Sequence, residues 1–288
     1  MAAGQFPLTI QREIAIRAQV HRTRVAPFAA LAVANRPLVF LAHGDSWFDY
    51  PLSGNDIAFD DTDVIAQLRG MGQPNPLILN VSHHGDSTID ELSLPKQKRL
   101  IDVLQDNDNW LEAGKPDAIL FSGGGNDIAG DEFCMYVDPA SGGGGLSVSR
   151  FEGALSSVEA SYLDLFAFRD QHAPGVPIFA HCYDFGIPNG EHPVCAGPWL
   201  KPSLDFLGYG NDLVRTRAIV RTALQAFRTR LVGLASEPAN NFHLVDTQGT
   251  LEDARWANEL HPDPAGFGAI AGKFLETLQA FPSFAGRI

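Results

Sequence analysis

The sequence predicts an α/β fold in which helices cover both faces of a parallel β-sheet. Short, continuous apolar runs are typical of strands that are buried on both faces, and stretches with helical periodicity lie between them. This alternation predicts a parallel sheet. Because crossovers between parallel strands are right-handed, the layout is limited to a doubly wound sandwich. The 288 residues suffice for one large domain or two small ones.

Five apolar runs are expected to form the strands, at residues 38–42, 77–81, 118–122, 176–181 and 242–246. Apolar residues recur every three or four positions over residues 151–166 and 213–234, which predicts two long helices between and after these runs. Ser149 and Glu152 form a candidate capping box for the first of these helices. Residues 266–281 are expected to form a closing helix.

The chain is expected to form one domain, residues 37–288, preceded by a helical arm, residues 1–36, that packs on the body. Two long loops are expected within the domain, at residues 128–149 and 183–212. Loops of this length in a compact domain are often lids or walls of a binding site. The second loop carries Trp199, Phe206 and Tyr209, which are expected either to contact an apolar part of a substrate or to pin the loop to the body.

Composition limits the class of protein. The net charge of −13 and the pI near 5.0 oppose binding to phosphate backbones, so no nucleic-acid partner is expected. No apolar run approaches the ~20 residues that span a bilayer, so no integral membrane association is expected. The first residues lack a convincing secretory signal, which predicts a cytoplasmic protein, with export left open. Cys182 and Cys195 would pair in an exported protein and are otherwise expected to be buried thiols.

The residues that follow each predicted strand are the candidates for a functional site, because ligands bind outside the carboxyl ends of the strands in such sheets. Ser46 follows the first run, at the expected start of a helix, and is the candidate nucleophile. His261, ahead of the closing helix, is the candidate general base. The side-chain amide of Asn126, with the N–H groups of Gly85 and Ser46, would bind an oxyanion.

Together these residues resemble the SGNH, or GDSL-type, hydrolase family, which is named for a serine, a glycine, an asparagine and a histidine in four sequence blocks. The four blocks here are Gly44-Asp45-Ser46, Gly85 in NVSHHGDS, Gly124-Gly125-Asn126-Asp127 and His261-Pro262. The resemblance implies a flavodoxin-like three-layer α/β/α sandwich with a five-stranded parallel sheet, and ester hydrolysis through an acyl-enzyme without metal or cofactor. The nucleophile elbow G-x-S-x-G of the α/β-hydrolases is absent, because Phe48 stands two residues after Ser46.

The chain departs from the family pattern at the third member of the triad. The family usually has aspartate three residues before the histidine, and this chain has Asn258 there. An asparagine oxygen can orient an imidazole, but it does not stabilise the imidazolium by charge. Three alternatives stay open: Asn258 orients His261, a carboxylate from elsewhere replaces it, or the site works as a Ser–His dyad. The candidate carboxylates are Asp184 first, then Asp263 and Glu259.

Other polar and aromatic residues near these blocks have predicted supporting roles. Asp45 and Asp127 are expected to bond loop N–H groups. The candidate substrate-lining residues are His43, Trp47, His84, His181 and Trp199, and the histidines, with His83, lack metal-ligand spacing.

The predicted function is hydrolysis of a small-molecule, lipid or sugar ester. A non-catalytic ligand-binding protein of the same fold and an acyltransferase using the same site are the alternatives. The oligomeric state is not predicted.

Overall fold

The computed structural model describes residues 8–50, 62–111, 114–191 and 197–288, and every structural statement below refers to these residues. Five parallel strands form the main sheet, in the order β2 (Leu77–Asn80), β1 (Val39–Gly44), β3 (Ala118–Ser122), β6 (Ile178–His181) and β7 (Phe242–Val245). Each lies on one of the predicted apolar runs, and the order is that of flavodoxin-like sheets. The predicted fold class is confirmed.

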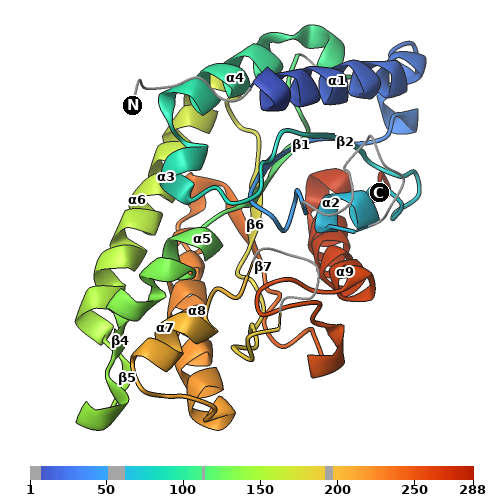
Figure 1. Ribbon diagram of the computed structural model, residues 1–288. Coiled ribbons are helices and arrows are strands. Elements are labelled where there is room, and N and C mark those ends of the chain that lie inside the picture. The colour runs from blue at the N-terminus through green and yellow to red at the C-terminus, as the bar shows by residue number, and fades with distance from the viewer. Residues whose placement is uncertain (1–7, 51–61, 112–113, 192–196) are drawn as a thin grey trace.

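Helices cover both faces of this sheet (Figure 1). The helices are α1 (Leu8–Val25), α2 (Val64–Leu68), α3 (Thr88–Glu91), α4 (Leu94–Gln105), α5 (Gly125–Ile128), α6 (Val148–His172), α7 (Lys201–Phe206), α8 (Leu213–Ala235) and α9 (Pro264–Ala280). Helices α2 and α9 pack together on one face, and α4, α6 and α8 lie on the other. The strands are almost fully buried between these layers, which explains why they appear in the sequence as continuous apolar runs.

The start of α6 differs from the predicted capping box. The helix begins at Val148 with Ser147 at the N-cap, so Ser149 lies inside its first turn. A two-stranded antiparallel hairpin, β4 (Val137–Asp138) and β5 (Gly145–Leu146), ends directly before it. The N–H of Ser147 still bonds the Tyr136 oxygen at 2.7 Å, so the hairpin sets where the helix begins.

Helix α1 packs on the body along β2, with Ile14, Ala18 and Val25 buried. The guanidinium of Arg17 is buried as well and donates to the Ser82 carbonyl at 3.1 Å and to the Asp49 carboxylate at 2.7 Å. The arm is thus fastened to residues that directly follow β1 and β2. Among the described helices, none has the length and apolar character that crossing a bilayer requires.

Candidate active site

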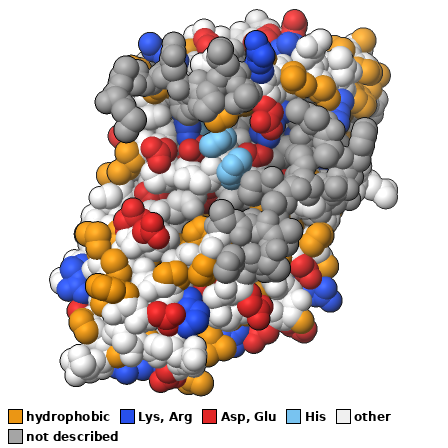
Figure 2. Space-filling model, viewed as in Figure 1, with side chains coloured by type: hydrophobic (Ala, Val, Ile, Leu, Met, Phe, Trp, Pro, Cys, Tyr) orange, Lys and Arg blue, Asp and Glu red, His pale blue; other side chains and the backbone are white. Residues whose placement is uncertain are grey.

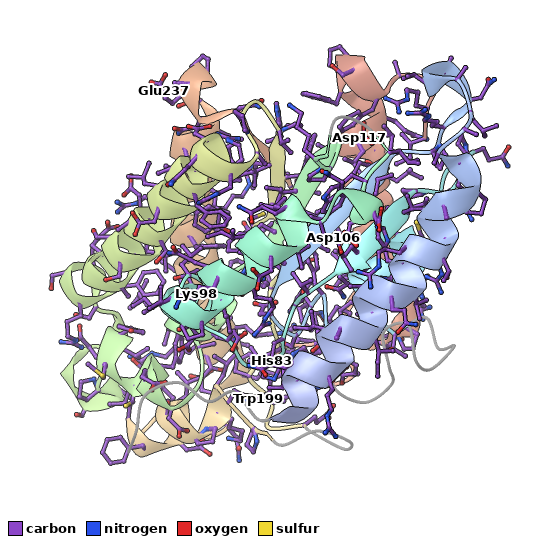
Figure 3. The ribbon with its side chains drawn as sticks, turned by 90° about the horizontal axis from the view of Figure 1, so that it is seen from above. His83, Lys98, Asp106, Asp117, Trp199 and Glu237 are labelled. Carbon is purple, nitrogen blue, oxygen red and sulfur yellow. The ribbon has the colours of Figure 1, made fainter. Side chains whose placement is uncertain are left out.

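The predicted site residues gather at one end of the sheet, where the parallel strands have their carboxyl ends. Figure 3 shows this polarity: His83 and Trp199 lie at one end of the molecule, and Asp117 and Glu237, which precede β3 and β7, lie at the opposite end. The loops that leave β1, β2, β3 and β6 therefore bring residues that are far apart in the chain to one edge. This is the arrangement expected for a binding site in a doubly wound sheet.

Ser46 lies in a tight turn directly after β1 rather than at the start of a helix, which corrects the prediction. The N–H groups of Phe48 and Asp49 both donate to the Asp45 carbonyl, at 3.1 and 3.0 Å, so the chain makes a single turn. Gly44 makes this turn possible: its φ is +153°, and a Cβ there would lie 2.3 Å from the Ser122 carbonyl oxygen. The backbone of β1 thus approaches β3 where the serine emerges.

The hydroxyl of Ser46 lies 2.7 Å from Nε2 of His261, and Nδ1 of the same ring lies 3.0 Å from Oδ1 of Asn258. That oxygen also accepts hydrogen bonds from the backbone N–H groups of Leu260 and His261, at 3.0 and 2.9 Å. Because an N–H group only donates, the atom facing it must be the amide oxygen. Nδ1 of His261 therefore carries the proton, and Nε2 offers its lone pair to Ser46.

The His261 ring is enclosed between two aromatic side chains and is 6% exposed. The Tyr50 ring lies 5.0 Å away and the Trp199 ring 5.4 Å away, measured between centroids. Burial, and to a lesser extent positive charge on His84, lowers the pKa of His261 to about 3. The imidazole is thus neutral over the physiological pH range, as a general base must be before it accepts a proton.

The three candidate carboxylates bond backbone N–H groups elsewhere, so the alternative in which one of them replaces the missing aspartate is not the arrangement in this structure. Asp184 accepts hydrogen bonds from the N–H groups of Phe185, Gly249 and Leu251, at 2.6–2.7 Å. Asp263 caps α9 through the N–H of Gly266 at 2.6 Å.

Glu259 is the third candidate carboxylate, and it fastens the long loop ahead of α7 instead. Its oxygens accept hydrogen bonds from the N–H groups of Gly190, Trp199, Leu200 and Lys201, at 2.6–3.0 Å. Asn258 is therefore the side chain that holds His261.

Of the predicted oxyanion donors, Asn126 lines the same pocket as Ser46 and His261, whereas Gly85 is exposed in the loop after β2. Among the described residues, the N–H groups of Ser46 and Gly85 donate to no acceptor, so both are available. The amide of Asn126 donates one hydrogen to the Asp86 carbonyl at 2.8 Å, which leaves its second N–H for a ligand. This bond joins the loop after β2 to the loop after β3.

The same two loops are joined a second time by Asp127. Its carboxylate accepts from the N–H of Thr88 at 2.9 Å and from the Thr88 hydroxyl at 2.8 Å. The expected role of Asp127, bonding loop N–H groups, is thus seen, but across to the other loop rather than within its own. This clamp holds Gly85 and Asn126 at a set separation.

A buried polar network lies beneath the nucleophile turn; the bond from Asp45 to a loop N–H was predicted, whereas the hydroxyl and histidine partners were not. The Asp45 carboxylate accepts from the hydroxyls of Ser122 and Tyr183, at 2.6 and 2.5 Å, and from the N–H of Trp47 at 3.0 Å. Ser122 in turn bonds Nε2 of His181 at 2.8 Å. Burial raises the pKa of Asp45 to about 6, while these hydrogen bonds lower it. The network fixes the turn that presents Ser46.

Two of the predicted substrate-lining residues do not line the site. His181 is used in the network just described, and burial lowers its pKa to about 3. His43 is buried with Nε2 at 3.0 Å from the Glu91 carbonyl, and burial lowers its pKa to about 4. His43 lies within β1 and His181 is the last residue of β6, and the alternation of side chains along a strand turns both rings into the body.

The other three lining candidates lie beside the site. Trp47 lines the pocket and donates from its ring N–H to the Leu260 carbonyl at 3.1 Å. Trp199 packs on His261, whereas Tyr209 of the same loop pins it to the body by donating to the Asp138 carbonyl at 2.6 Å. His84 is exposed and stacks on His83. Figure 2 shows histidine side chains at the surface beside acidic side chains, on the face that is seen in Figure 1.

A pocket opens beside Ser46 and extends between α5 and α8. Its polar end is formed by Ser46, Asn126 and His261. Its apolar end is formed by Ile128, Phe133, Leu200, Val220, Ala223 and Leu224. The site thus combines a hydrogen-bonded serine and histidine, free N–H donors and an adjoining apolar pocket, an arrangement that can bind and attack a carbonyl compound.

Cys182 is a free, buried thiol, and burial raises its pKa to about 11. Cys195 lies outside the described residues, so the pairing of the two stays a prediction.

No protein-family model matches the chain, and no curated protein sequence matches it. Solved structures do. The lipase Lip_vut3 from a goat rumen metagenome is 15% identical, with a TM-score of 0.55, over 83% of this chain and 97% of that one. The extracellular lipase from Streptomyces rimosus is 14% identical, with a TM-score of 0.51, over 83% of this chain and 99% of that one. A phospholipase A1 from Streptomyces albidoflavus is 14% identical, with a TM-score of 0.51, over 84% of this chain and 100% of that one.

The chain therefore has the fold of these lipases. This is the three-layer α/β/α sandwich implied by the resemblance to the SGNH hydrolases.

Proposed function

We propose that this protein is a serine carboxylic-ester hydrolase that acts through an acyl-enzyme on Ser46. The observation that carries the proposal is the continuous hydrogen-bonded chain from the Ser46 hydroxyl through His261 to Asn258, with the tautomer of the imidazole set by the backbone. A serine hydroxyl is a weak nucleophile until a base takes its proton, and this chain places a neutral base at 2.7 Å.

Each step of the reaction has a residue in place. Ser46 Oγ attacks the ester carbonyl as its proton passes to Nε2 of His261. The oxyanion forms against the N–H groups of Ser46 and Gly85 and the amide of Asn126. Nε2 then returns the proton to the leaving alcohol, and the acyl group stays on Ser46. A water molecule, deprotonated by the same nitrogen, attacks the acyl-enzyme and releases the acid.

Because Nδ1 of His261 faces the amide of Asn258 rather than a carboxylate, the proposed catalyst is slower than a complete triad, but the base is retained. Asn258 supplies the acceptor that selects the reactive tautomer, which is one of the two contributions an aspartate makes. The other contribution, stabilisation of the imidazolium by charge, is missing. A non-catalytic protein would have no need for the aligned Ser46, His261 and free oxyanion donors.

The test compares wild type with Ser46→Ala and His261→Ala on p-nitrophenyl esters, with Ser156→Ala as a matched control on the exposed face of α6. We expect turnover by wild type and by the control, and loss of about 10³-fold or more in both site variants. A fluorophosphonate should label wild type and the control but not Ser46→Ala. Absence of both turnover and labelling in wild type would overturn the proposal and favour a binding protein.

A further inference from the structure

The pocket beside Ser46 has a polar mouth and an apolar interior, and its walls come from separate parts of the chain. Ile128 ends α5, Phe133 belongs to the turn that follows, and Leu200 precedes α7. Val220 and Ala223 face the same space from α8. All five side chains are buried, whereas Leu224, which lines the same pocket from α8, is partly exposed.

The direction of the pocket distinguishes the two halves of an ester. In the tetrahedral intermediate the oxyanion must face Asn126, and the leaving oxygen must face Nε2 of His261 to receive its proton. The remaining substituent, the acyl chain, extends from the carbonyl carbon toward the apolar end. An alcohol must depart while the acyl group is still attached to Ser46, whereas the acyl group can stay against the buried apolar walls of the pocket.

The free volume of the pocket is about 60 Å³. For comparison, an apolar cavity of about 150 Å³ accommodates benzene, so the space here suits an acyl chain of about two to four carbon atoms. Ala223 limits this space from α8. It carries the smallest side chain of the stripe in which Val220 lies one turn before it and Phe227 one turn after it, with all three side chains buried.

We propose that this pocket is an acyl-chain site for short acyl groups, and that Ala223 and Val220 set the chain length that it accepts. The proposal rests on the proposed function, because it assigns the acyl half of the substrate to the pocket next to the proposed nucleophile. It excludes long-chain lipid esters as preferred substrates.

The first experiment measures kcat/KM for p-nitrophenyl acetate, butyrate and octanoate. Wild type should lose at least about tenfold from butyrate to octanoate, since a poorly fitting group in an apolar pocket changes kcat/KM by about 10- to 200-fold. Ala223→Leu places an isobutyl group in the pocket and should lower the butyrate-to-acetate ratio by about tenfold or more. Val220→Ala enlarges the pocket and should raise the ratio of kcat/KM for octanoate to kcat/KM for butyrate.

The matched control is Gln225→Leu, which adds a similar apolar group on the exposed face of the same helix. It should leave all these ratios unchanged. Unchanged ratios in both Ala223→Leu and Val220→Ala would overturn the proposal. So would an effect of Ala223→Leu on alkyl acetates of increasing alcohol length without an effect on acyl length, because the pocket would then hold the alcohol.

A second readout separates failure of the pocket from failure of the hydrolase. Binding of acetate, butyrate and octanoate is measured by NMR on Ser46→Ala, in which the nucleophile is absent and the pocket is intact. Binding that favours butyrate and weakens when Ala223→Leu is added supports the pocket even if wild type hydrolyses nothing. Hydrolysis by wild type without length selectivity in rate or binding would keep the hydrolase and overturn the pocket.

Discussion

Asn258 offers a direct test of how His261 works, because replacing it with aspartate restores the carboxylate usual in the family. Two unit charges about 4 Å apart interact with about 4 kcal/mol at an effective dielectric constant of about 20. That free energy corresponds to about three pKa units of the imidazolium. The site can hold the new charge, because the N–H groups of Leu260 and His261 already donate to one oxygen and Tyr50 lies 3.3 Å from the other position.

The cost of burying the carboxylate offsets part of this gain, so we expect Asn258→Asp to raise the pKa of His261 by about one to three units. Because only the neutral imidazole acts as the base, kcat/KM should be at its full value above the pKa of His261. It should fall as the pH drops through that pKa. Wild type should therefore show no histidine limb between pH 5 and 8, since the pKa lies at about 3. In the variant the limb should move up toward that range.

The rate above the limb should also rise, by about 10- to 10³-fold. This is less than the ~10⁴ associated with loss of a triad aspartate where the tautomer is wrong, because Asn258 already selects the right tautomer. The assay is the pH profile of kcat/KM on p-nitrophenyl acetate, with His261 followed by NMR. Asp184→Asn is the control and should leave the limb where it is. A limb that stays in place in Asn258→Asp, or a rate that falls, would refute the reasoning.

Three further predictions concern residues around the site. Glu91 is fully buried, and its carboxyl has no hydrogen-bond partner among the described residues. Burial raises the pKa of Glu91 well above its usual value, and repulsion from neighbouring carboxylates adds to this effect. Wild-type protein should therefore lose stability as the pH rises above about 4.3, the pKa of the glutamate in the unfolded chain. In urea unfolding from pH 5 to 8, the free energy of unfolding of Glu91→Gln relative to wild type should rise by up to about 1.4 kcal/mol per pH unit. Equal pH dependence of the two proteins would contradict this. Asp127→Ala removes the bonds to Thr88 that help to place Asn126, so kcat should fall by about 10- to 100-fold with little change in KM. Asp127→Asn should recover part of the lost kcat. An equal loss of kcat in both variants would argue for a different role of Asp127. Glu259→Gln removes an acceptor oxygen for loop N–H groups and should lower the free energy of unfolding by about 1–3 kcal/mol in urea titrations. An unchanged urea midpoint of unfolding would show that the loop is held by other contacts.

The sequence by itself predicted the sheet and supplied the four residues of the proposed site. Strands buried on both faces leave a direct trace as apolar runs, and their carboxyl ends must meet at one edge whatever the details of packing. Ser46, Gly85, Asn126 and His261 each follow such an element, so their proximity follows from the fold class. The resemblance to the SGNH hydrolases implied that Asn258, at the position of the family's usual aspartate, is the candidate partner of His261.

The tertiary structure decided which polar groups serve the site and which only hold it together. Asp184 was the first candidate acid in the sequence and Glu259 a further one, yet the carboxylates of both accept hydrogen bonds from loop N–H groups. His181 follows a strand as the site residues do, but it is buried against Ser122. These partners lie about 60 positions apart in the chain, and each contact depends on the direction in which a strand or loop turns a side chain. Local sequence carries no record of that direction, so only the packed fold determines it.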